Sequence, residues 1–215
     1  MLYVIVYTIA ETSKKSNNME KQNNVSGQAF AFPDVFFTRE LNVDNEINEP
    51  MLVSLKREIN FLNSVNNDSI TIFIGSLGGY FDPAKEMFEM FLGSPSEIIG
   101  VAGKKISSLA AMLAFQGCHL RLIRRETEMM LHKITQFTTF RFVPFETDRQ
   151  KSHLVLEKEF NVATNKQRYI NTILSHISGK SENYIIELLK EKRVLSPKEI
   201  IRLKFADGFY PDDLP

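Results

Sequence analysis

The stretch that decides the fold is EIIGVAGKKISSLAAMLAFQ, residues 97–116. It begins with a short apolar run that is typical of a buried strand, and Gly103 follows this run directly. Residues 105–116 then carry apolar side chains almost all the way round a helix, and such a helix belongs inside a protein. The sequence therefore predicts a strand, a glycine turn and a buried helix whose first turn holds Ser107 and Ser108.

Strands and helices alternate on both sides of this stretch. Upstream, an Ile/Phe-rich run indicates another strand, and Asp82 followed by Pro83 predicts a capped helix start. This alternation favours an α/β fold in which helices cover a largely parallel sheet. We expect strands at 34–38, 69–75, 97–102, 119–124 and 128–132, helices that begin near residues 50, 82, 105, 150, 182 and 197, and irregular structure at 135–149. The first helix carries an apolar stripe formed by Leu52, Leu55, Ile59 and Leu62, and Ser196 with Glu199 predicts a capping box at the start of the last helix.

Composition and charge exclude several classes of function. The 215 residues include 26 basic and 26 acidic side chains, a balance that argues against a nucleic-acid site built on excess positive charge. A single cysteine, Cys118, excludes an internal disulfide, and the four histidines lack metal-ligand spacing. No segment is long and apolar enough to cross a bilayer, so we expect a cytoplasmic protein without membrane contact, or a stromal one if it is organellar. The polar residues before residue 30 predict an arm or loop region at 1–29. The remaining residues, 30–215, are expected to form a single domain.

Three features at the ends of predicted strands could carry chemistry. The glycines Gly78 and Gly79 follow one strand, and their N–H groups could face a bound carbonyl oxygen. Ser108 lies near the positive end of a helix dipole, which favours developing negative charge. His132 ends another strand and could take a proton from a serine. Taken singly, these features are also typical of a tight turn, a helix cap and a hydrogen-bonded core histidine.

Their order along the chain resembles the proteolytic subunit of the Clp protease, ClpP, within the ClpP/crotonase-like fold. The 29 residues from Gly79 to Ser108 fit the family's spacing. The distance from Gly103 to Ser108 is one residue longer than in the family, so Ser107 is a rival nucleophile. The matching motifs are Gly75-Ser76-Leu77-Gly78-Gly79, Gly103…Ser108-Leu109, Met130-Leu131-His132, Ser178-Gly179-Lys180-Ser181 and Leu195-Ser196-Pro197-Lys198-Glu199.

The resemblance implies a ClpP-like serine peptidase domain at 30–215, with repeated β-β-α units and a handle helix at 150–177. In such an enzyme His132 would deprotonate Ser108, and the backbone N–H groups of Gly79 and Leu109 would hold the oxyanion. It also implies a homo- or hetero-oligomeric ring, a heptamer or stacked heptamers, that an AAA+ unfoldase ATPase supplies with unfolded protein substrates. No metal or organic cofactor is implied.

One departure from the family pattern concerns the catalytic acid. The position of the family's aspartate is Lys192 here, and a cation cannot hold an imidazolium as a carboxylate does. Glu191, Glu146 and Asp148 are possible substitutes. Three other functions stay open: a catalytically impaired structural subunit of a mixed ring, a crotonase-type acyl-CoA enzyme, and a Ser–Lys peptidase with Lys158 or Lys192 as base.

Overall fold

The computed structural model describes residues 38–134 and 148–211, without the side chains of 148–156. The arm expected at 1–29, nearly all of the strand expected at 34–38 and the irregular segment expected at 135–149 lie outside these described parts, apart from the start of a helix at Asp148. The described residues after Phe37 form one unit of the chain.

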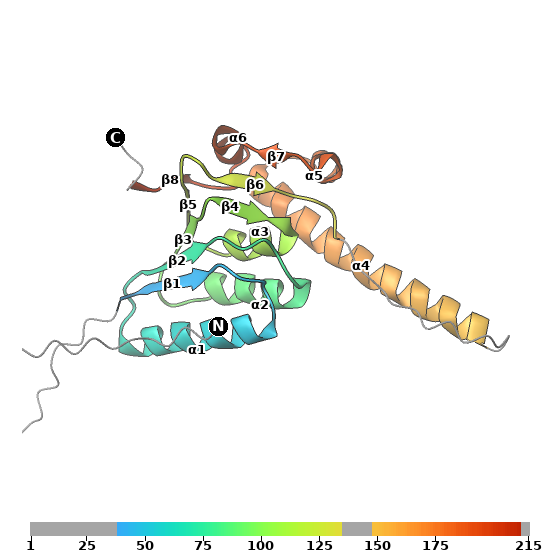
Figure 1. The fold of residues 1–215 in the computed structure, drawn as a ribbon, viewed down its shortest axis with the longest axis horizontal. Coiled ribbons are helices and arrows are strands. Elements are labelled where there is room, and N and C mark those ends of the chain that lie inside the picture. The colour runs from blue at the N-terminus through green and yellow to red at the C-terminus, as the bar shows by residue number, and fades with distance from the viewer. Residues whose placement is uncertain (1–37, 135–147, 212–215) are drawn as a thin grey trace, which may run out of the picture. The chain divides into compact units, whose positions relative to one another are not determined.

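A parallel sheet of five strands forms the centre of this unit (Figure 1). All neighbouring strands run parallel, and Ile72 pairs with Gly100 in the middle of the sheet. The burial of alternate residues along the second strand follows the two-residue period of a pleated sheet. The strand order is β1 (Glu40–Val43), β2 (Ile70–Ile74), β3 (Ile98–Ala102), β5 (Leu120–Ile123) and β8 (Gly208–Phe209).

Helices pack beside this sheet, which confirms the predicted α/β class (Figure 1). In the first helix, Asn48 accepts a hydrogen bond from the Met51 N–H, and Pro50 lies in the first turn. The third helix is buried all round, as its sequence predicts. The helices are α1 (Glu49–Val65), α2 (Phe81–Leu92), α3 (Ser108–Gln116), α4 (Asp148–Ser178), α5 (Glu182–Glu191) and α6 (Pro197–Arg202).

A second, three-stranded sheet lies next to the first and corrects the predicted helix at 105–116. Residues Lys105–Ser107 form strand β4, which pairs in parallel with β6 (Glu128–Met130). Strand β7 (Val194–Leu195) pairs with β6 in the antiparallel direction. Because β4 uses its backbone groups in this pairing, the buried helix begins only at Ser108.

Two further predictions about element ends were wrong. The helix α2 begins after Tyr80, and Asp82 lies in its first turn, where it forms an ion pair with Lys166 at 2.7 Å instead of capping the helix. Strand β6 ends at Met130, so His132 lies two residues beyond the strand. In contrast, the capping box that Ser196 and Glu199 predict is present at the start of α6.

The long helix α4 is a single element of 31 residues, as the handle prediction requires. Its C-terminal half packs against α5, and its N-terminal half runs away from the sheets (Figure 1). Phe160 in that half is 71% exposed. The structure thus confirms a protruding helix, which lies between β6 and β7 in the chain.

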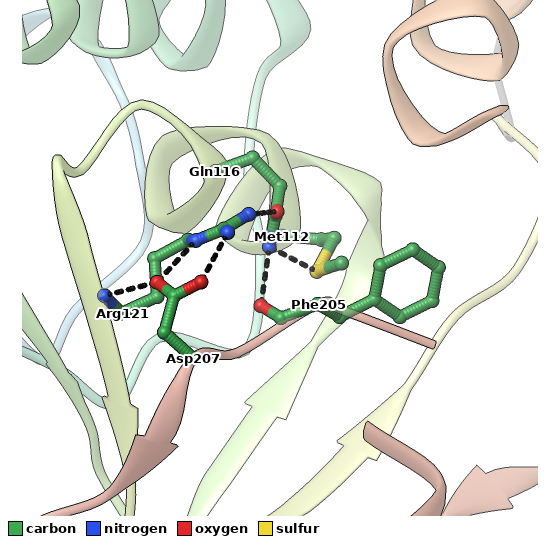
Figure 2. A network of polar contacts seen from close by, with 5 residues as sticks. All are labelled: Met112, Gln116, Arg121, Phe205 and Asp207. Carbon is green, nitrogen blue, oxygen red and sulfur yellow. Dashed lines mark hydrogen bonds and ion pairs between the residues drawn. The ribbon is translucent and has the colours of Figure 1, made fainter. Parts of the chain in front are cut away.

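A polar network ties the last strand to the core (Figure 2). Arg121 donates to both carboxylate oxygens of Asp207, at 2.6 and 3.0 Å, and to Gln116 Oε1 at 2.6 Å. Gln116 is buried and donates to the carbonyl of Phe205 at 2.9 Å. Buried polar groups are costly unless they are paired, so this network explains how a two-residue strand such as β8 stays in place.

Candidate active site

Ser108 lies at a sharp turn from strand β4 into helix α3. Its φ is 77°, in the left-handed region that side chains other than glycine rarely adopt. Such a backbone costs about 1–3 kcal/mol and persists where the surrounding structure holds it, often at functional sites. The turn leaves Ser108 half-buried at the positive end of a buried helix, a position suited to a nucleophile.

The neighbouring Ser107 lies in a different environment. It pairs with Met130 in the sheet, and its N–H donates to the carbonyl of Ser76 at 3.2 Å. Its hydroxyl is buried, and no hydrogen-bond partner reaches it from the described residues. Because Ser107 is enclosed and Ser108 is accessible, the geometry favours Ser108 as the nucleophile.

The diglycine of the β2–α2 loop touches this serine. A Cβ on Gly78 would lie 2.4 Å from the Ser108 Cβ and 2.8 Å from its Oγ, and the φ of Gly78 is +115°. A Cβ on Gly79, where φ is +152°, would lie 2.2 Å from the carbonyl oxygen of Ile47. The close approach of the Ser108 side chain to Gly78, and of the Ile47 backbone to Gly79, therefore requires glycine at both positions.

The same loop orients candidate oxyanion donors. The bridge between Ile47 and Gly79 uses the carbonyl of Gly78 and the N–H of Tyr80, at 2.9 and 2.8 Å, and leaves the Gly79 N–H outside the ladder. Leu109 belongs to the first turn of α3, where N–H groups have no acceptor within the helix. The N–H groups of Gly79 and Leu109, the predicted donors, therefore take no part in the hydrogen bonds of the bridge or of the helix.

His132 follows the second sheet at the same edge as Ser108. Since Ser107 pairs with Met130 in a parallel ladder, the residues after each strand emerge side by side. The imidazole is half-buried, and its Nδ1 lies 2.7 Å from the carbonyl oxygen of Lys133. Within the described ranges no hydrogen bond joins His132 to the Ser108 hydroxyl. Such a bond often tightens only when substrate binds.

Among the candidate acids only Glu191 has a described side chain, and no hydrogen bond joins it to the imidazole of His132. Lys192 ends α5 with a φ of 53° and, through the pairing of Met130 with Val194, lies at the same edge as His132. The carboxylate of Glu191 accepts a hydrogen bond from Arg193 Nε at 2.9 Å. Glu146 and the side chain of Asp148 lie outside the described residues.

Two groups near His132 are absent from the predicted site. They are the carbonyl of Lys133 and the Gln167 side chain, which accepts a hydrogen bond from the Ile134 N–H at 2.7 Å. A backbone carbonyl has no signature in sequence, and a glutamine on a helix is unremarkable until the fold brings it close. Lys158, a candidate base, is exposed on the projecting half of α4.

Comparison with known proteins establishes the family. The family model described as Clp protease matches residues 28–210, which is most of the chain. The chain therefore belongs to the Clp protease family, and the resemblance seen in its motifs is confirmed.

Solved structures agree on the fold. A point mutant of ClpP1 from Listeria monocytogenes aligns with a TM-score of 0.69 and 20% identity, covering 83% of this chain and 95% of that one. ClpP1 from the same organism aligns with a TM-score of 0.64 and 19% identity, covering 80% and 91%. No curated protein matches the sequence. At these identities the chain is a divergent member of its family.

No helix in ranges 38–134 and 148–211 is long and apolar enough to cross a membrane. The same residues contain no group of three or more His, Cys, Asp or Glu side chains placed to hold a metal ion.

Proposed function

We propose that this chain is a Clp-type serine endopeptidase subunit that hydrolyses peptide bonds of unfolded proteins. The observation that carries the proposal is the contact between Gly78 and the strained Ser108. A nucleophile on a sharp turn beside a diglycine is the arrangement that acyl transfer needs, because the attacking oxygen and the oxyanion donors must face one carbonyl.

In the proposed reaction His132 Nε2 takes the hydroxyl proton of Ser108 as Oγ attacks the peptide carbonyl. A C–O bond forms, and the carbonyl electrons move onto an oxyanion held by the N–H groups of Gly79 and Leu109. The C–N bond then breaks, and the imidazolium returns its proton to the leaving amine. Water, deprotonated by the same imidazole, releases the acyl group and frees the serine. Losing one oxyanion donor costs such enzymes about 3 kcal/mol in barrier height.

A catalytically impaired subunit is the second candidate. It is favoured by the cation Lys192 at the acid position and by the ion pair that ties Glu191 to Arg193. In a serine protease triad, loss of the acid lowers the rate by about 10⁴-fold when the histidine tautomer goes wrong. Such a subunit would contribute to the wall of a mixed ring rather than to cleavage.

We further propose that the chain works in a ring, of seven copies or two stacked sevens, which an AAA+ unfoldase supplies with substrate by ATP hydrolysis. The support is the projecting half of α4, where Phe160 and Val162 are exposed apolar side chains suited to contact between rings. A closed chamber would confine an unspecific peptidase.

The test uses assembled protein and an unfolded, fluorophore-labelled substrate. Wild type and Ser107→Ala are expected to release fluorescent peptides, and Ser108→Ala to release none. Ring assembly is followed in parallel by light scattering. Cleavage that survives Ser108→Ala would refute the assignment, whereas an intact ring without cleavage by wild type would favour the impaired subunit.

A further inference from the structure

The peptide unit between Lys133 and Ile134 is held on both of its polar sides. Its carbonyl oxygen lies 2.7 Å from His132 Nδ1, and its N–H lies 2.7 Å from Gln167 Oε1. The Nε2 of Gln167 donates to Asn171 Oδ1 at 2.8 Å, and Asn171 is only 6% exposed. A chain of hydrogen bonds therefore runs from the buried side of α4 to the imidazole.

Chemistry allows one direction for each of these bonds. A carbonyl oxygen can only accept, so the proton between His132 and Lys133 belongs to Nδ1. The lone pair is then on Nε2, which is the tautomer that a general base for a serine hydroxyl must have. A backbone N–H can only donate, so Gln167 presents its oxygen to Ile134 and its amide nitrogen to Asn171.

We propose that Gln167 is a positioning residue that, through this peptide unit, does for His132 what a carboxylate does in a complete triad. The inference rests on the proposed function and deepens it. The carbonyl selects the tautomer and the ring orientation, and the glutamine fixes the plane of the peptide that carries the carbonyl. This relay, the chain of hydrogen bonds from Gln167 through the peptide unit to His132, carries no charge. It therefore orients the imidazole without the full stabilisation of the imidazolium that a carboxylate adds.

The neighbouring contacts explain why such a relay suits this chain. The family's acid position is held by Lys192, and Glu191 is bound to Arg193. The segment after β6 has left its sheet at Met130, and the hydrogen bond to Gln167 anchors its backbone to α4.

The test is ¹⁵N NMR of histidine-labelled full-length protein at about pH 8.5, where an ordinary imidazole is neutral. A His132→Asn variant assigns the signals of His132. We expect wild type to show a protonated Nδ1 and an unprotonated Nε2. In Gln167→Met we expect a mixture of tautomers and about tenfold slower labelling of Ser108 by a fluorophosphonate, because one orienting hydrogen bond is lost.

Two further variants act as controls. Lys166→Met removes an ion pair from the same helix and is expected to leave the tautomer and the labelling rate unchanged. Gln167→Glu keeps an oxygen facing the Ile134 N–H, although it loses the donor to Asn171, and is expected to keep the tautomer of wild type. A protonated Nε2 in folded wild type, or an unchanged tautomer in folded Gln167→Met, would overturn the proposal.

The measurements separate this inference from the proposed function. If Ser108 is labelled but the His132 tautomer is the same in wild type and in Gln167→Met, the positioning role fails and the peptidase proposal stands. If the tautomer depends on Gln167 but no serine is labelled, the relay stands and the peptidase proposal fails.

Discussion

Gly78 and Ser108 approach each other so closely that a single methyl group on the glycine would lie 2.4 Å from the Ser108 Cβ. Both residues have positive φ angles, +115° and 77°. The glycine turn after β2 and the strained turn after β4 are thus held against each other. The contact fixes the serine relative to the loop that carries the Gly79 N–H.

Gly78→Ala is therefore expected to abolish the reaction with a fluorophosphonate, lowering the labelling rate by at least about 100-fold, the cost of a lost oxyanion-hole alignment. The added Cβ must displace the Ser108 side chain. Gly179→Ala is the matched control, since Gly179 also has a positive φ, +66°, but no atom lies within 4 Å of its added Cβ. It is expected to lose about 1 kcal/mol of stability and to label at the rate of wild type. Equal loss of labelling in both variants would mean that general destabilisation, not contact with Ser108, is responsible.

Ser107→Ala is expected to leave stability unchanged or to raise it slightly. The Ser107 hydroxyl is buried and unpaired among the described residues, and removing such a group relieves its desolvation cost. Thermal unfolding of the variant against wild type measures this difference. A drop of several degrees in Tm would show that the hydroxyl has a partner in solution.

Lys192→Asp is expected to raise the rate of acylation well over tenfold. The pairing of Met130 with Val194 brings residue 192 to the edge where His132 lies, and aspartate tolerates the left-handed backbone found there. A carboxylate near Nδ1 would stabilise the imidazolium, as in a complete triad. Lys192→Asn, which has the same shape without the charge, is the control. If both variants react at the wild-type rate, residue 192 does not reach the imidazole.

The network of Figure 2 predicts how the protein responds to acid. Burial by itself raises the pKa of Asp207, but the hydrogen bonds and charge of Arg121 outweigh it, so the pKa is lowered. A carboxylate with a lowered folded pKa stabilises the fold fully above its unfolded pKa of about 3.9, and this contribution is lost as pH falls through the folded value.

Asp207→Asn should therefore lower Tm by about 2–4 °C above pH 5, for a loss of about 1 kcal/mol discounted for the partial exposure of the carboxylate. The gap between the variant and wild type should close below about pH 4. Melting curves between pH 3 and pH 7 give the answer, and a gap that widens toward acid would contradict the sign of the pKa change.

The sequence predicted the elements whose periodicity is long and regular. The apolar stripe Leu52, Leu55, Ile59 and Leu62 is buried as expected, and the capping box at Ser196 marks the start of α6. The short strands were missed because two or three residues, as in β7 and β8, carry no periodic signal. The sequence of Lys105–Ser107 predicts the start of a helix, and these residues form a strand because they pair with β6.

The candidate site divides in the same way. Glycines and a serine at fixed spacing are visible in sequence, because close approach and nucleophilic attack require these residue types. The surroundings of His132 cannot be seen in the sequence, because the hydrogen-bond partner of its Nδ1 is the main-chain carbonyl of Lys133, which any residue could supply. The role of Gln167 depends on α4 passing beside residue 134, which is a property of the tertiary fold.

The most direct test of the account is to map the covalent adduct. Folded full-length protein is treated with a fluorophosphonate, digested and analysed by mass spectrometry, beside a His132→Asn variant. The account predicts a single adduct on Ser108 in wild type and a large fall in adduct formation without the imidazole. An adduct on Ser107, or one on Ser108 that forms equally fast in His132→Asn, would contradict it.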